Sequence, residues 1–121
     1  MRKMRVIMRG PPTIRAAREV AHADVGQSVS LVCEATAVPR IKGFQWSFQG
    51  RELGVPSQKT NISIVESQQG NVIRSTLIIA KLGENNFGDY RCRVSNQMGE
   101  AVLKIKLRPV GKCTPLLHFT L

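Results

Sequence analysis

The chain has 121 residues, which is enough for one domain with a buried core and too few for two. Hydrophobic residues make up 42% of it, an ordinary globular share that argues against wholesale disorder. Eighteen Lys and Arg against eight Asp and Glu give a net charge of +10, which favours acidic partners but does not by itself indicate nucleic acid.

The first predicted segment, residues 1–12, is basic and ends in Gly10-Pro11-Pro12, so we interpret it as a linker or domain edge. Its apolar stretch, 6–8, is shorter than the roughly 7–15 residues of a secretory signal. No run in the sequence is long enough for a transmembrane helix. We therefore interpret the chain as a fragment, an isoform or a mispredicted gene end.

From residue 13 to residue 109, short alternating runs are separated by turn signals, which predicts a single all-β sandwich or barrel domain. Residues 13–22 are predicted to form one loose strand. The next strands place one set of alternating side chains on the buried face. This set contains Val29, Leu31, Cys33, Ala35, Phe44, Trp46 and Phe48.

The second half of the domain continues this alternation. Residues 60–65 and 72–80 are predicted as strands joined by a polar turn at 67–70, and residues 96–99 as a hairpin. The predicted inward residues are Leu77, Ile79, Tyr90, Cys92, Val94, Leu103, Ile105 and Leu107. The predicted outward residues of the last two strands are Arg91, Arg93, Ser95, Lys104, Lys106 and Arg108. Residues 110–121 show no pattern and are expected to be an unstructured tail.

The three cysteines indicate whether the cellular compartment of the protein is oxidising or reducing. Cys33 and Cys92 each lie in an alternating apolar run, whereas Cys113 lies in the tail. One long-range pair and one leftover indicate a buried disulfide and a free or intermolecular thiol, hence an oxidising environment. The short apolar start does not agree with secretion, so a cytosolic domain with reduced thiols stays an alternative.

Four ordered blocks of sequence resemble the immunoglobulin family in its I-set form, over about residues 13–108. They are Gly26-x-x-Val29-x-Leu31-x-Cys33; Trp46-Ser47-Phe48-Gln49-Gly50-Arg51-Glu52-Leu53; Ser75-Thr76-Leu77-x-Ile79 with Leu82 and Gly88-Asp89-Tyr90-Arg91-Cys92; and Asn96-Gln97-Met98-Gly99. The run from Gly88 to Asn96 is also similar to nephrin- and echinoid-like adhesion proteins.

The resemblance implies a two-sheet Greek-key sandwich of the I-set type. Cys33 and Cys92 would bridge the sheets, with Trp46 packed on the sulfurs and Leu77 in the core. Tyr90 resembles a tyrosine corner, whose hydroxyl anchors the preceding turn. Asn86 departs from the family, which usually has an acid at this position, so a neutral hydrogen bond is expected in place of an ion pair.

A basic patch is the candidate binding face. Arg91, Arg93, Lys104 and Lys106 point outward from adjacent predicted strands, close enough to form one surface. Four like charges side by side repel, so an acidic protein surface or heparan sulfate would compensate them, with Arg40 and Lys42 as added contacts. The competing interpretation is a solvated face with scattered charges.

Two further residues are candidate modification sites. Asn61 opens the sequon Asn61-Ile62-Ser63 and is a candidate for N-glycosylation if the chain is secreted. Cys113 is a candidate for pairing with another chain, although the simpler interpretation is an incidental tail residue.

Catalysis has no support in the sequence. His22 and His118 are far apart and lie near no nucleophile pattern. No Cys or His spacing suggests a metal, and no glycine-rich phosphate loop suggests a cofactor.

The sequence therefore predicts a non-catalytic binding module of an extracellular or cell-surface adhesion or receptor protein. It would bind a protein on a cell surface, homophilically or heterophilically. An intracellular structural domain of a filament or muscle-type protein is the alternative. Nucleic-acid binding ranks lowest because no exposed aromatics or recognition motif accompany the basic groups.

Overall fold

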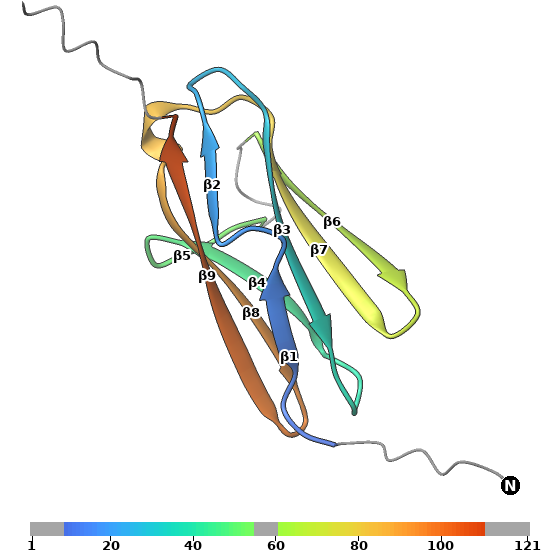
Figure 1. The fold of residues 1–121 in the computed structure, drawn as a ribbon. Helices are drawn as coiled ribbons and strands as arrows, with labels where there is room; N and C mark the ends of the chain where they lie inside the picture. The colour runs from blue at the N-terminus through green and yellow to red at the C-terminus, as the bar shows by residue number, and fades with distance from the viewer. Residues whose placement is uncertain (1–8, 55–60, 111–121) are drawn as a thin grey trace, which may run out of the picture.

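The computed structural model describes residues 9–54 and 61–110. It contains two sheets of mostly antiparallel strands, which pack around one core (Figure 1). One sheet has the order β1 (Thr13–Ala16), β3 (Val29–Thr36), β7 (Val72–Ile79) and β6 (Ile62–Gln69). The other has the order β2 (Val20–Ala23), β9 (Gly99–Pro109), β8 (Gly88–Asn96), β4 (Gly43–Phe48) and β5 (Arg51–Glu52). The predicted all-β sandwich is confirmed.

The core lies between the sheets because alternate residues of each strand turn inward. Its largest fully buried side chains include Trp46, Tyr90 and Leu77. Cys33 of β3 and Cys92 of β8 form a disulfide that joins the two sheets. Burial of this apolar set supplies the main drive for folding.

The polar atoms of Trp46 and Tyr90 each form a hydrogen bond inside the fold. The indole Nε1 of Trp46 donates a hydrogen bond to Ser75 Oγ at 2.8 Å, and Ser75 is itself buried. The Tyr90 hydroxyl donates to the carbonyl oxygen of Asn86 at 2.6 Å, and burial raises the pKa of Tyr90 to about 12. Asn86 ends the short helix η1 (Glu84–Asn86), and its Oδ1 accepts from the amide of Gly83. Its neutral hydrogen bond is therefore local to that turn.

The prediction of one strand over residues 13–22 is wrong. The chain pairs with β3 through β1, then crosses to the other sheet, where β2 pairs in parallel with β9. Each piece alternates by itself, but the inward positions change parity between them, from Ile14 and Ala16 in β1 to Ala21 and Ala23 in β2. Which sheet a strand joins depends on long-range partners.

The predicted turn at 67–70 is too long. β6 continues to Gln69, which pairs with Val72, and only Gly70 and Asn71 make the turn. Gly70 has a φ of 62°, a left-handed value that favours glycine. The polar residues before it extend as a strand because β7 supplies hydrogen bonds along their whole length while their side chains stay exposed. Thr60, where this strand was expected to begin, lies outside the described residues.

Asn96 ties three chain segments together at one end of the sandwich. Its Nδ2 donates to the carbonyl oxygens of Gly10 and Pro39, both at 2.9 Å, and its Oδ1 accepts from the amide of Met98 at 2.8 Å. The amide of Gly10 in turn donates to the carbonyl of Val38. Residues just before β1 are thereby held against the sandwich.

No helix in residues 9–54 and 61–110 is long and apolar enough to cross a membrane. Over the same residues, no cluster of three or more His, Cys, Asp or Glu side chains is arranged to hold a metal ion.

Candidate functional site

The four basic residues selected from the sequence lie together on the outer face of the five-stranded sheet. Arg91 and Arg93 come from β8, and Lys104 and Lys106 from β9. Arg91 pairs directly with Lys104 across the two strands. They reach this face because their neighbours Tyr90, Cys92 and Ile105, among others, take the inner one. We call this surface the outer β8–β9 face.

This face is mixed in charge, and the premise of four uncompensated bases is wrong. Lys104 Nζ lies 3.7 Å from Asp89 Oδ2, and Arg93 Nε lies 3.9 Å from Glu100 Oε1. Asp89 and Glu100 share the strand parity of the bases, so both acids turn outward beside them. All four side chains of these pairs are about half exposed, so each pair stabilises the fold by less than about 1 kcal/mol.

Arg91 lies near the middle of this face, opposite Lys104 in the register of β8 and β9. Within the part of the chain that the structure describes, neither Arg91 nor Lys106 has an ion-pair partner. Arg91 also borders a hollow of about 270 Å³ over β4, β5, β8 and β9. Its lining consists of Gln45, Trp46, Ser47, Gly50, Glu52, Arg91, Arg93 and Val102. The charge of Arg91 is thus available to an incoming group.

A second hollow of about 240 Å³ continues from the first along β4 and β8. It is lined by Lys42, Gly43, Phe44, Gln45, Arg93 and Ser95. Gln45 and Arg93 line both hollows, so together they form one shallow groove. Lys42 joins this groove as expected, whereas Arg40 lines neither part of it.

Sequence analysis missed Gln45, Ser47, Glu52 and Val102 as parts of this surface. Val102 had a signal, because it shares the outward parity of Lys104 and is still a large apolar residue; 47% of its surface is exposed. The others are ordinary outward residues whose neighbours become visible only when β4 is placed next to β8 and β5 next to β4.

The groove contains several kinds of polar group. It offers guanidinium and amide donors, hydroxyl and carboxylate groups, and one exposed apolar side chain. Small-molecule sites are usually concave and bury most of the ligand, whereas this groove is shallow and open. Mixed polar and apolar groups of this kind are also typical of the outer part of protein–protein interfaces.

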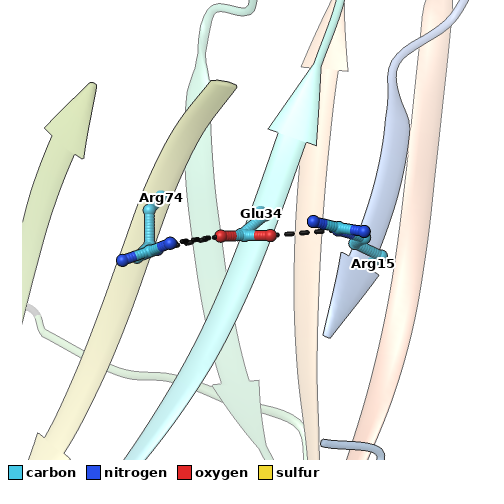
Figure 2. Close-up of polar contacts among 3 residues, drawn as sticks. All are labelled: Arg15, Glu34 and Arg74. Atoms are coloured by element: carbon cyan, nitrogen blue, oxygen red, sulfur yellow. Dashed lines mark hydrogen bonds and ion pairs between the residues drawn. The ribbon is translucent and has the colours of Figure 1, made fainter. Parts of the chain in front are cut away.

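A second cluster, which the sequence did not predict, lies on the outer face of the four-stranded sheet (Figure 2). Arg15 Nε donates to Glu34 Oε1 at 3.0 Å, while Arg74 Nε and Nη2 donate to Oε2 at 2.9 and 2.6 Å. One carboxylate therefore cross-links β1, β3 and β7. Glu34 points away from the core, as its position between the inward residues Cys33 and Ala35 requires, but with the two arginines beside it only 9% of its surface is exposed.

The hydrogen bonds from Arg74 and then from Arg15 lower the pKa of Glu34 below its usual range. A lowered pKa means that the folded state favours the charged carboxylate. This contribution to stability is complete above the ordinary Glu pKa of about 4.3 and is lost as the pH falls through the lower folded-state value.

We expect Glu34→Gln to lower the free energy of unfolding at pH 7 by about 1 kcal/mol. The amide keeps one acceptor but turns an N–H₂ donor toward the other guanidinium. The estimate is small because the side chains of Arg15 and Arg74 are 79% and 50% exposed. Denaturant unfolding of the wild type and the variant at pH 7 and pH 3 measures this difference, which should shrink at the lower pH.

Glu66→Gln is the matched control, since Glu66 is exposed on β6 and the substitution removes the same charge. It should change stability by less than about 0.5 kcal/mol. Equal effects of the two substitutions would show that net charge, and not the cross-link, is responsible.

The remaining candidate residues are dispersed. Asn61 is exposed where β6 begins, and its Nδ2 donates to the carbonyl oxygen of Lys81 at 2.6 Å. His22 is exposed on β2, opposite Arg108. Cys113 and His118 lie outside the described residues.

A family model described as immunoglobulin domain matches residues 11–96. The chain is 33% identical over 103 residues to the Irregular chiasm C-roughest protein of Drosophila melanogaster and 31% identical over 111 residues to Neural cell adhesion molecule 1 of Homo sapiens. These alignments cover 85% and 90% of this chain but only 13% and 12% of the relatives. The chain thus spans about an eighth of the length of these curated relatives.

Solved structures are similar in fold. The crystal structure of Dpr2 Ig1-Ig2 in complex with DIP-Theta Ig1-Ig3 matches with a TM-score of 0.75 and 25% identity, over 84% of this chain and 33% of that chain. The structure of Titin M4 matches with a TM-score of 0.65 and 23% identity, over 86% of this chain and 100% of that chain. The titin likeness shows the shared fold alone.

Proposed function

This chain belongs to the immunoglobulin domain family, and we propose that it is a non-catalytic protein-binding module, of the I-set type, from an extracellular adhesion or receptor protein. The relatives named above support this proposal, since one of them is a neural cell adhesion molecule. The Dpr2 structure is a complex between immunoglobulin domains of two proteins. This chain spans only a small part of the length of its relatives. Any activity of a longer protein that contains it is therefore also a proposal.

The proposed binding site is the outer β8–β9 face with its groove. The main observation that supports it is the position of the charged Arg91 side chain at the groove. The guanidinium borders the groove without an ion-pair partner among the described residues, next to Val102. A carboxylate of a partner protein, placed beside an apolar side chain, would complement both groups. Arg93 and Lys104 contribute less, because Glu100 and Asp89 already lie beside them.

Heparan sulfate is the competing ligand for the same cations. The net charge of +10 favours it. The outward carboxylates Asp89 and Glu100 oppose it, because a polyanion would be repelled where a mixed protein surface would not. We therefore propose a protein partner and treat heparin as a competitor in the test.

Arg91→Glu is expected to weaken binding by more than about tenfold, because it turns a favourable contact with a partner carboxylate into repulsion. Beads coated with the chain report homophilic binding by aggregation. Staining of cells with fluorescent chain reports heterophilic binding. Both are measured with and without soluble heparin, and Lys81→Glu is the control of equal charge change away from this face.

Binding by Arg91→Glu that equals the wild type would contradict the site. The same conclusion would follow if alanine at Arg91, Arg93, Lys104 and Lys106 together left binding unchanged. If soluble heparin only competes with the protein partner, the result agrees with the proposal. If the chain binds heparin-coated beads but no protein partner, the result favours the polysaccharide.

The folding unit that we propose is residues 13–109, with 1–12 as a linker and 110–121 as a tail. β1 begins at Thr13 and β9 ends at Pro109. Gly10 also hydrogen-bonds to the sandwich. The binding experiments therefore use the full chain.

An intracellular structural role remains the second candidate. The titin structure named above shares the fold of this chain and does not distinguish between the two roles. The two proposals differ in the state of Cys33 and Cys92, which would be oxidised in an extracellular protein and reduced in a cytosolic one.

A further inference from the structure

The outer face of the four-stranded sheet has a hollow of about 290 Å³ beside the ion-pair cluster of Arg15, Glu34 and Arg74. We call it the Thr36 hollow. The groove around Arg91 lies on the other sheet, so the two surfaces are separate. The lining of the Thr36 hollow comes from β1, β3 and the start of β7 and consists of Thr13, Ile14, Arg15, Glu34, Ala35, Thr36 and Val72.

The two guanidiniums of the cluster keep most of their hydrogen-bond donors for another group. An arginine side chain has five N–H donors. Within the part of the chain that the structure describes, Arg15 donates to Glu34 through Nε, and Arg74 donates to it through Nε and Nη2. The side chains of Arg15 and Arg74 are 79% and 50% exposed. Figure 2 shows them on either side of the carboxylate, which holds both in place.

The charges around Glu34 favour an anionic ligand. Two guanidiniums share one carboxylate, so the cluster as a whole is positive. The neighbours across the strands are neutral, since Ser67 lies opposite Arg74, and Thr13 lies opposite Thr36 in the next outward row. Glu34 is also the only acid in the lining of the hollow. A carboxylate brought to this face would therefore meet excess positive charge.

An apolar surface borders these charges. Val72 lines the hollow, faces the same side of β7 as Arg74, and does not pack against the core. Thr36 is exposed and adds a methyl group. Val72 and Arg74 are two residues apart, as are Thr36 and Glu34, and this is the interval between side chains on one face of an extended chain. The charged and apolar contacts thus lie at the interval at which an extended peptide presents its side chains.

We propose that the Thr36 hollow binds an extended acidic segment of a partner protein, in which a carboxylate and an apolar side chain are two residues apart. The carboxylate accepts hydrogen bonds from the free donors of Arg15 and Arg74, and the apolar side chain packs on Val72 and Thr36. Because Glu34 already holds both guanidiniums, little side-chain freedom is lost on binding. The site is independent of the groove around Arg91, so the domain would hold one protein on each sheet.

Nuclear magnetic resonance of the full chain, with its disulfide intact, tests this site with defined probes. The first probe is the capped peptide Glu-Ser-Val, and its control is Gln-Ser-Val, which has the same shape without the charge. We expect the acidic peptide to shift the Nε–H resonances of Arg15 and Arg74 and the amide resonance of Thr36 until saturation. The neutral peptide should bind severalfold more weakly. Sodium sulfate at equal ionic strength is the third probe, because it has charge but no apolar group, and it should produce smaller shifts.

Thr36→Glu and Thr36→Lys are a matched pair, because both place a long charged side chain at the same exposed position of the hollow. Thr36→Glu should weaken binding of the acidic peptide severalfold through repulsion, whereas Thr36→Lys should retain or strengthen it. Thr36 is the last residue of β3 and its side chain is exposed, so both variants should fold. Similar unfolding midpoints of the two variants check this.

Several results would overturn the inference. It fails if neither peptide shifts the resonances of Arg15, Arg74 and Thr36, if the acidic and neutral peptides bind alike, or if the two Thr36 variants bind the acidic peptide equally. Sulfate that reproduces every shift at the same concentration would show an adventitious ion only. Shifts around Arg91 concern the proposed function, and either site can fail this test without the other.

Discussion

Replacing Cys33 and Cys92 by alanine together is expected to lower the free energy of unfolding by about 4 kcal/mol. The disulfide closes a loop with a sequence separation of 59 residues and therefore restricts the unfolded chain strongly. Both cysteines are fully buried and join the two sheets, so the loss also removes core contacts. A domain of this size has a net stability of roughly 5–15 kcal/mol. Denaturant unfolding of the wild type and the double variant measures the difference.

Cys113→Ala is the control for this experiment, because it removes a thiol without touching the bridge. It should leave the unfolding midpoint unchanged. The oxidised wild type should react with a thiol reagent at one cysteine, and at all three after reduction in denaturant. A stability that is equal with and without reductant would contradict the prediction and would favour the intracellular structural role.

Trp46→Ala is expected to cost about 4 kcal/mol, the other large effect. Trp46 is 1% exposed and lies directly opposite Cys92 in the register of β4 and β8. Its loss leaves a cavity beside the disulfide and removes the hydrogen bond to the buried Ser75 hydroxyl. Thermal or denaturant unfolding, followed by circular dichroism because the only Trp is lost, measures the change.

Trp46→Phe separates the two parts of this cost. It keeps most of the apolar volume but leaves Ser75 without its donor, so it should be less harmful than alanine. Gln45→Ala, one residue away on the exposed face, should change stability by less than about 0.5 kcal/mol. If Trp46→Ala lowers the free energy of unfolding no more than Gln45→Ala does, the indole is not a main contributor to core stability.

The two large effects should not add. Trp46 and Cys92 are cross-strand neighbours, and substitutions of residues in contact are generally coupled. A triple variant that lacks the disulfide and the indole should therefore lose a different amount from the sum of the separate losses. Simple additivity would indicate that the two groups stabilise the sandwich independently.

Much of the fold could be predicted because strand periodicity is local. The alternation of Leu31, Cys33 and Ala35 with outward residues identified the inner face of β3 correctly. The same reasoning placed Arg91 and Lys104 on one outer face, where they pair. The disulfide came from the family resemblance together with the position of the two cysteines in alternating runs.

The candidate site was predicted less completely. Strand parity would have placed Asp89 and Glu100 beside the bases, but the sequence analysis overlooked it, and the ion pairs themselves depend on diagonal neighbours across β8 and β9. The groove around Arg91 depends on β4 lying next to β8, a contact between segments far apart in the sequence, with β5 beyond β4. No local pattern contains that information.

The sequence by itself determined which side chains of most strands face inward, because a strand exposes its two faces alternately whatever its neighbours are. It also determined the location of the sequon at Asn61 and of the basic residues. Only the tertiary structure decided that residues 13–22 divide between two sheets, that Glu34 is covered by Arg15 and Arg74, and that Asn96 holds Gly10. These features are set by partners distant in the chain, whose positions exist only once both sheets have formed.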